Sequence, residues 1–177
     1  MRVTAVNEPE LTFRGGAGDD MVLSYGGDQV IWSRRQVPEA LLENSELVFV
    51  GYGINAPEQG WNDYEGIDVS GKTVVMLVND PGFATQDPEL FNGNAMTYYG
   101  RWTYKYEEAA RQGTDGILVI HETAAAGYGW NVIEDGRQGP QFGLARDNGN
   151  MDRVKVEGWL QHHVAEEILA SAGLDLA

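Results

Sequence analysis

Cysteine is absent from this chain of 177 residues, and histidine is scarce, with three residues. Without cysteine the chain can form neither disulfides nor thiolate metal sites. A zinc centre built from imidazole and carboxylate groups needs three or four ligands held together, which so few histidines barely supply. The lack of cysteine does not fix the compartment, because many exported bacterial proteins also lack it.

Positive charge and long apolar runs are also scarce. Lysine and arginine number 12 against 27 aspartates and glutamates, which gives a formal net charge of -15. Nucleic acid and anionic membrane surfaces repel so acidic a chain. No apolar run approaches the roughly 20 residues of a membrane span, and residues 1–6 lack the apolar core of a signal peptide. We therefore expect no nucleic-acid partner, no membrane insertion, and either a cytoplasmic protein or a mature fragment of an exported one.

The motifs of common catalytic sites are incomplete. The segment HETAA at residues 121–125 begins like the HExxH motif of zinc hydrolases, but alanine stands where the second histidine belongs. This segment also follows an expected strand, so we interpret His121 as a polar residue at a strand end. The chain has no G-x-S-x-G elbow and no glycine loop in the context that binds phosphate. We therefore predict no catalytic residue and no metal ligand in this chain.

Two further groups of polar residues fit local structure better than metal binding. His162 and His163 are neighbours on an expected helix, diverge by roughly 100°, and are expected to pair with acids four residues later, Glu166 and Glu167. The densest acids, Asp63, Glu65 and Asp68, lack the spacing of an EF-hand calcium loop. We expect these acids to cap turns, with calcium binding as the alternative.

Short strands separated by glycine turns dominate the first 50 residues. Residues 38–42 are expected to form one helical turn, and the strands are expected at 3–6, 11–13, 21–25, 30–33 and 47–50.

A β-α-β unit follows. Residues 72–78 and 116–120 are apolar runs typical of strands buried on both faces. Between them, the helix expected near 98–112 carries one apolar stripe of Trp102, Tyr106, Ala109 and Ala110, with Gly113 as a left-handed stop. The charged residues Arg101, Lys105, Glu108 and Arg111 are expected to point away from that stripe. Such a crossover predicts two parallel strands.

The last predicted elements are a strand at 154–156 and a helix at 159–172, with Gly173 as its stop. Residues 83–97 and 121–150 are expected to be long loops. The whole chain, 1–177, is interpreted as a single α+β domain with a mixed β-sheet or barrel, flanking helices and one central β-α-β unit.

Aromatic residues are the remaining candidates for function. Five lie within nine residues, 98–106, and others fall in the long loops. Aromatic and arginine side chains dominate interface hot spots, although packing of the loops onto the sheet explains them equally well. We predict a contact surface formed by Asn79, Asp80, Phe83, Tyr98, Tyr99, Arg101, Trp102, Tyr128 and Trp130.

Several segments together form a familiar pattern. The helix with Lys105 and Ala109-Ala110 leads through GTDGILV at 113–119. The other segments are ELVFVGYGI at 46–54, DYEGIDVSGK at 63–72, LVNDPG at 77–82, MTYYGRWTYKY at 96–106, and HE followed by GYGW at 121–130. Together they resemble the protease-associated (PA) domain of bacterial M28-family zinc aminopeptidases, with Thr114 in place of the usual alanine. The resemblance spans residues 45–175 and is weaker for residues 1–44.

The resemblance implies a swivelling β/β/α fold and a non-catalytic role. The zinc ligands of such enzymes lie in a separate peptidase domain, to which the chain would return near residues 173–177. The partner is then the cognate peptidase domain of the same polypeptide, together with a peptide substrate, and the location is periplasmic or extracellular. The domain would act as a lid, a substrate-access element or a protein-interaction surface, and it would need no cofactor of its own.

Two alternatives stay open at the level of sequence. The chain could be a free-standing peptide- or sugar-binding module that uses the loop aromatics. It could also be a hydrolase whose site the motif search does not recognise, which requires titratable groups with shifted pKa values converging in a pocket.

Overall fold

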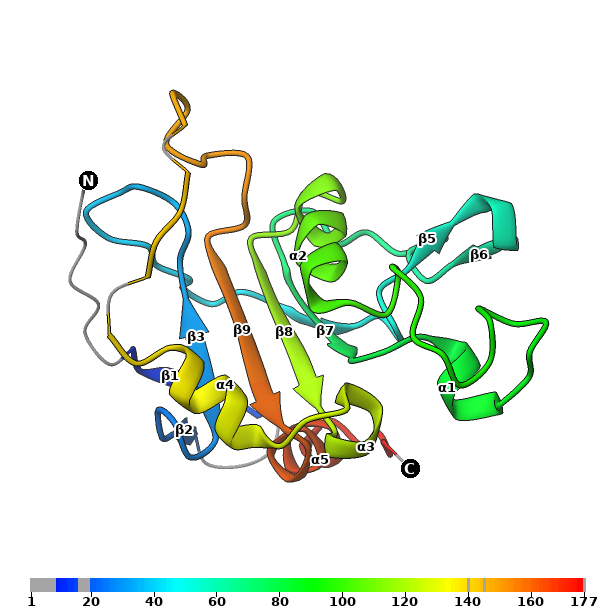
Figure 1. The fold of residues 1–177 in the computed structure, drawn as a ribbon. Helices are drawn as coiled ribbons and strands as arrows, with labels where there is room; N and C mark the ends of the chain where they lie inside the picture. Colours follow the sequence, from blue (N-terminus) through cyan, green and yellow to red (C-terminus); the bar gives the residue numbers. More distant parts are fainter. Residues whose placement is uncertain (1–8, 16–19, 140, 145, 177) are drawn as a thin grey trace.

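The computed structural model describes residues 9–15, 20–139, 141–144 and 146–176 (Figure 1). The strands are β1 (Leu11–Phe13), β2 (Met21–Leu23), β3 (Gln29–Trp32), β4 (Leu47–Phe49), β5 (Asn55–Ala56), β6 (Trp61–Asn62), β7 (Thr73–Leu77), β8 (Gly116–His121) and β9 (Val156–Gln161). The helices are η1 (Pro57–Gln59), α1 (Pro81–Thr85), α2 (Trp102–Arg111), α3 (Thr123–Ala126), α4 (Trp130–Gly136) and α5 (His162–Ser171).

A mixed five-stranded sheet with the order β3-β9-β8-β7-β4 organises the fold. Strands β4, β7, β8 and β9 are parallel neighbours, and β3 pairs antiparallel to β9. The chain therefore crosses from β4 to β9 in one direction without reversing. Right-handed crossovers then place the connecting helices on one face, and α2, α3 and α4 indeed lie on the same side (Figure 1).

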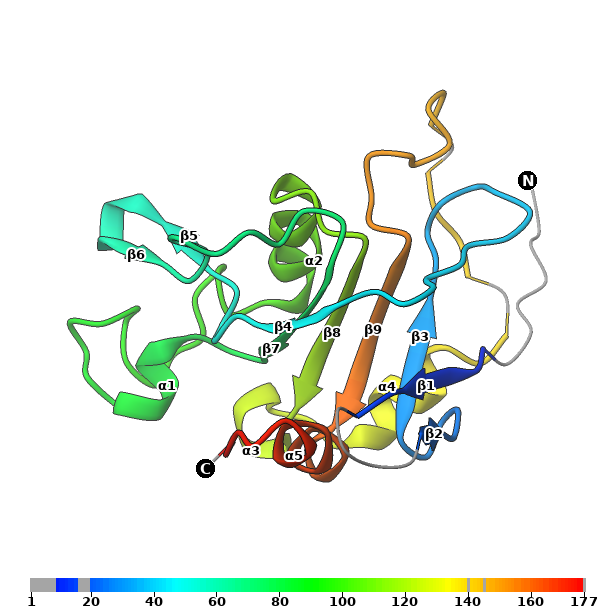
Figure 2. The same ribbon diagram turned by 180° about the vertical axis from the view of Figure 1, so that it is seen from behind.

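Alternation along the strands divides the interior into two cores. In β8, Ile117 and Val119 point to the face covered by α2, α3 and α4, which we call the front core. Leu118 and Ile120 point to the rear core, which α5 and the β1–β2 hairpin cover (Figure 2). Side chains of a strand alternate between faces with period two, so this run is apolar throughout because both faces are buried.

The predicted β-α-β unit is confirmed, since α2 connects the parallel strands β7 and β8. Tyr106 and Ala109 are buried in the front core, with Trp102 half-buried beside them. Gly113 has φ +77°, as expected of a helix stop. Lys105 and Glu108 lie outside that stripe, as predicted, yet both are buried. Helix α2 has a second packing partner on its other side.

That partner is a side lobe, defined here as residues 51–66 and 80–100. It contains β5, η1, β6 and α1, and it projects beside α2, away from β9 (Figure 1). Its own small core is aromatic, with Phe91 in edge-to-face contact with Trp61 at 5.7 Å and with Tyr99 at 5.9 Å between ring centroids. Tyr99 contacts Tyr104 of α2 in the same way at 4.9 Å, so α2 lies between the lobe and the sheet.

The boundary between the last strand and the last helix differs from the sequence prediction. Residues 156–161 form β9, whereas the prediction ended the strand at 156 and began the helix at 159. Leu160 shares the rear core with Val164 and Ile168, so the apolar stripe runs on from strand to helix. Residues 156–161 form a strand because they pair with both β8 and β3. Glycine is needed at position 158, since a Cβ atom there would lie only 2.5 Å from the Ile31 side chain.

Three other predictions have definite outcomes. The strands predicted at 11–13, 21–25, 30–33, 47–50 and 72–78 are confirmed with bounds that differ by at most two residues, whereas residues 38–42 form no helical turn. The loops at 83–97 and 121–150 hold short helices, α1 at the start of the first and α3 and α4 in the second. The strand predicted at 3–6 lies outside the described residues. In the described part of the chain, no helix combines the length and apolar character that crossing a bilayer requires.

Candidate functional site

A pocket of about 180 Å³ lies at the carboxyl ends of β7 and β8. We call it the strand-end pocket. Its walls include Tyr52, which follows β4, Val78, which follows β7, and Phe83 of α1. Ligands of parallel α/β sheets bind outside the carboxyl ends of the strands, usually where the strand order reverses. Here the order does not reverse, so position alone does not identify the pocket as a cofactor site.

A tight, fully buried turn supports the pocket at the end of β7. Asn79 has φ +70°, a conformation that asparagine tolerates better than most residues. Its side-chain amide donates to the Ala125 carbonyl at 2.7 Å, and its Oδ1 accepts from the Asp80 backbone N–H at 2.8 Å. Asp80 is 0% exposed and its Oδ2 accepts from the Thr97 backbone N–H and hydroxyl at 2.9 and 2.7 Å. Its Oδ1 is buried with no hydrogen-bond partner among the described residues.

Lys105 lies fully buried beneath the same wall. Its Nζ donates to the Tyr52 carbonyl at 2.5 Å. Burial lowers the pKa of Lys105 to about 7, while the charges of Asp63 and Asp80 favour the protonated form without offsetting burial. The sequence placed Lys105 outside the apolar stripe of α2 and within the pattern that resembles the PA domain, but neither observation predicted its burial.

Carboxylates surround the Tyr52 side of the pocket. Burial raises the pKa of the Tyr52 phenol, and the negative charges of Glu122, Asp80 and Asp63 raise it further. Glu122 lines the pocket, is exposed, and forms no ion pair with any described residue. The pocket therefore combines apolar walls with a negative surrounding field.

His121 is a structural residue at the end of β8, as the sequence indicated. Its Nε2 lies 3.0 Å from the Tyr128 carbonyl, and its ring contacts Tyr128, Trp130 and Trp159. Burial lowers the pKa of His121, so the ring is neutral at pH 7. Trp130 is fixed in turn by donating its indole N–H to the Gly26 carbonyl at 2.6 Å.

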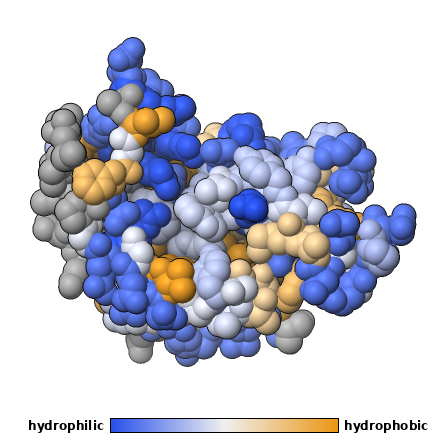
Figure 3. All heavy atoms as spheres, in the orientation of Figure 1, coloured by the Kyte–Doolittle hydropathy of each residue, from blue (hydrophilic) through white to orange (hydrophobic). Residues whose placement is uncertain are grey.

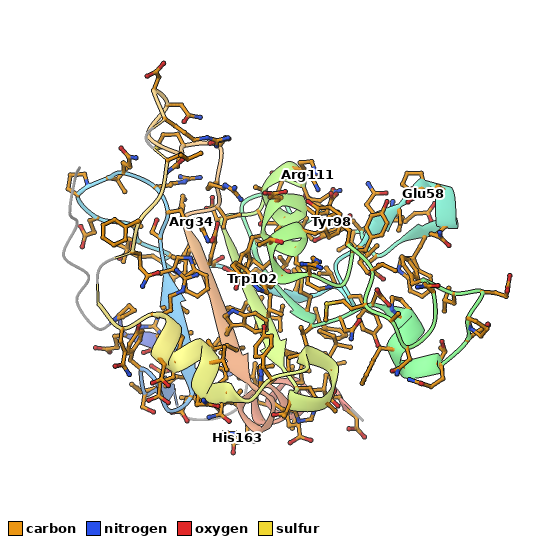
Figure 4. The ribbon with its side chains drawn as sticks, viewed as in Figure 1. Arg34, Glu58, Tyr98, Trp102, Arg111 and His163 are labelled. Carbon is orange, nitrogen blue, oxygen red and sulfur yellow. The ribbon has the colours of Figure 1, made fainter. Side chains whose placement is uncertain are left out.

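The predicted contact residues come from separate segments and fall into four groups. Four of them are half-buried against the front core, namely Phe83, Trp102, Tyr128 and Trp130. Asn79 and Asp80 are buried, and Tyr99 belongs to the core of the side lobe. Tyr98 and Arg101 are exposed. Tyr98 and Trp102 lie at the lobe-facing and sheet-facing sides of the start of α2 (Figure 4).

The surface above these residues is less hydrophilic than its surroundings. Figure 3 shows weakly polar and apolar residues at the centre of the face that carries α2 and α3, within a mainly hydrophilic border. We call this surface the aromatic face and define it by Phe83, Tyr98, Trp102, Tyr128 and Trp130.

A second polar cluster, which the sequence did not reveal, lies at the amino end of β9. Glu157 is fully buried and accepts from the Trp32 indole at 3.0 Å and from Arg34 at 2.9 Å. The Arg137 guanidinium stacks 3.3 Å above the Trp32 ring. Burial lowers the pKa of Arg137, and the nearby charge of Arg34 lowers it further. These contacts connect β3, β9 and α4, which indicates a structural role.

The predictions for the acidic loop and the paired histidines are confirmed in part, for Asp63, Asp68 and His162. Asp63 accepts from the Ile54 backbone N–H at 2.9 Å and Asp68 from that of Ser70 at 3.0 Å, so both stabilise turns. His162 pairs with Glu166 at 3.6 Å. The pairing of His163 with Glu167 is wrong, because His163 lies 3.9 Å from Asp28 instead. Within the described residues, no three histidine, aspartate or glutamate side chains are arranged to hold a metal ion.

These features define the chain as an α+β domain with a mixed sheet, one aromatic face and a small acidic pocket. Comparison with models of known protein families, with curated proteins and with solved structures finds no match.

Proposed function

We propose that this chain is a non-catalytic accessory domain of the PA type, belonging to an M28-type zinc aminopeptidase. In this proposal the fold is of the swivelling β/β/α kind. The zinc ions belong to the peptidase domain of the same polypeptide, and the enzyme works in the periplasm or outside the cell. The domain acts as a lid, a substrate-access element or an interaction surface for that peptidase domain and its peptide substrate.

The aromatic face is the observation that carries this proposal. Phe83, Trp102, Tyr128 and Trp130 come from three segments, yet all pack on the front core and stay partly accessible. Large aromatic side chains anchored on a rigid scaffold contribute strongly to binding because ordering them costs little entropy. Such a face suits a module that docks onto a neighbouring domain.

Two exposed residues allow a test at the outer surface, namely Tyr98 of the aromatic face and Arg101 of the predicted contact surface. Tyr98→Ala and Arg101→Ala are each expected to weaken binding to an M28-type peptidase domain added in trans by about tenfold. Val22→Ala is the matched control, since Val22 is 64% exposed and lies on β2, at the rear. Equal binding by all three variants would refute the proposed surface.

A direct assay separates this proposal from an unrecognised hydrolase. The purified chain is expected to show neither turnover of chromogenic amino-acid substrates nor tight zinc binding by calorimetry. Robust hydrolysis by the chain alone would overturn the accessory role.

A free-standing peptide- or sugar-binding module is the second candidate, favoured by the partly accessible tryptophans of the aromatic face, Trp102 and Trp130. A ligand bound through Trp102 or Trp130 in the absence of any peptidase would support it. Unchanged ligand binding by Trp102→Ala and Trp130→Ala would exclude it.

A further inference from the structure

The strand-end pocket has the size and the lining for one extended side chain. Its volume of about 180 Å³ is below the roughly 300 Å³ at which pockets for small molecules begin. Val78, Ile120 and Ala125 supply aliphatic walls, and the rings of Tyr52 and Phe83 add aromatic ones. Such walls suit a flexible apolar stem and cannot enclose a nucleotide or a larger cofactor.

The charges around the pocket select a cation. Glu122 at the rim is exposed and forms no ion pair within the described residues. Asp80, between the wall residues Val78 and Phe83 in the chain, keeps one buried carboxylate oxygen without a hydrogen-bond partner there. The nearby cation, Lys105, is fully buried and directed to the Tyr52 carbonyl, so it is not presented to a ligand.

We propose that the strand-end pocket binds a lysine side chain of a peptide or protein segment. The stem lies between Tyr52 and Phe83, and the ammonium group reaches Glu122. Aromatic rings attract ammonium groups through their negative faces, and the carboxylate adds a direct ion pair. The binding of a lysine side chain follows from the pocket itself. Only the origin of that lysine, the peptidase domain or its peptide substrate, rests on the proposed function.

Nuclear magnetic resonance titration with short peptides tests this assignment. The probe is acetyl-Gly-Gly-Lys-Gly-Gly-amide, and the same peptide with norleucine in place of lysine removes only the charge. The lysine peptide is expected to shift the backbone amides of Val78, Ala84, Glu122 and Ala125 in a saturable way, and the norleucine peptide at least fivefold more weakly. Equal responses to the two peptides, or no shifts at these amides, would overturn the proposal.

Matched variants locate the ammonium group. Glu122→Gln is expected to weaken binding of the lysine peptide about three- to fivefold, as loss of a partly exposed ion pair does. Glu167→Gln, an equally exposed change on α5 at the rear, is expected to leave it unchanged. Equal affinities of the Glu122→Gln and Glu167→Gln variants would contradict the proposed ion pair.

A free amine distinguishes the source of the cation. n-Butylammonium carries the same stem and charge without a peptide backbone, and we expect it to bind more weakly than the lysine peptide. If it binds as tightly as the peptide, the pocket serves small amines and the peptide partner is wrong. Because none of these measurements uses a peptidase domain, their failure is distinguishable from failure of the proposed function.

Discussion

The sheet and the side lobe bury different kinds of side chain. The strands of the sheet bury mainly aliphatic side chains that alternate between two cores. The side lobe buries aromatic rings, and its interface with α2 encloses Lys105, while Phe91 and Gln86 have positive φ values that are uncommon for such residues. The contrast shows a scaffold stabilised by generic apolar burial beside a lobe that depends on individual contacts.

The largest loss of stability is expected from a substitution in the sheet. Leu118 is buried in the central strand β8. Leu118→Ala should lower the free energy of unfolding by about 2–5 kcal/mol, because it leaves a cavity that the packed strands cannot fill. Chemical denaturation measures this loss. A change below about 1 kcal/mol would show that the rear core is loosely packed and would remove the contrast with the lobe.

The buried lysine predicts a pH dependence that arises between α2 and the lobe. Its pKa is lowered from 10.5 to about 7. Between these values the unfolded chain binds the proton and the folded chain does not, so the free energy of unfolding rises with pH, at most by about 1.4 kcal/mol per unit. Denaturation series from pH 7.5 to 9.5 measure the slope.

Lys105→Met provides the comparison for that slope. It removes the titrating group, so the rise with pH should disappear, although the Tyr52 carbonyl also loses its hydrogen bond. The denaturation series stays below pH 10 because two tyrosines titrate above it. Burial raises the pKa of Tyr52 and that of Tyr104, the latter to about 12, so above pH 10 these groups make the free energy of unfolding fall with pH. If the free energy of unfolding of Lys105→Met rose with pH as steeply as before, another titrating group would be responsible for the slope.

A smaller effect is expected from the hydrogen bonds of Tyr104. Its hydroxyl donates to the Asn55 carbonyl at 3.0 Å and accepts from the Asn55 backbone N–H at 3.1 Å. Tyr104→Phe should cost about 1–2 kcal/mol. In this variant, backbone hydrogen exchange should become faster only in residues 52–62. An equal increase in the exchange rate of β8 would show that the lobe and the sheet unfold as one unit.

The smallest effect is expected from Tyr98, which is 58% exposed. Tyr98→Ala should lower the free energy of unfolding by less than about 1 kcal/mol, because the mostly exposed ring loses only its edge contacts with Tyr99 and Tyr104. Thermal denaturation checks this value. A loss above 1 kcal/mol would mean that Tyr98 supports the aromatic core of the lobe rather than a contact surface.

The same contrast explains what the sequence could predict. Strands β7 and β8 were predictable because a run buried on both faces is apolar throughout, and α2 because its stripe facing the sheet has helical spacing. The burial of Lys105 and Glu108 was not predictable, because it depends on a lobe formed by segments without periodicity. The helix predicted at 159–172 also began too early, within β9. Leu160 fits the helical spacing because it packs in the same rear core as Val164 and Ile168, although it belongs to a strand.

The candidate site was predicted only in part. The sequence placed Asn79, Phe83, Trp102 and Trp130 at the contact surface, because these residues lie in or beside segments rich in aromatic residues. It did not place Tyr52, Glu122 or Lys105 there, although they come to the strand-end pocket and its wall. Only the parallel order of β4, β7 and β8 brings the ends of these strands to one edge.

Hydrogen exchange of the chain with and without an M28-type peptidase domain tests the central claim most directly. The account predicts protection of residues 78–84, 98–102 and 122–130, with α5 and β1–β2 unchanged. Protection of the rear face alone, or none at all, would contradict the assignment of the aromatic face as the docking surface.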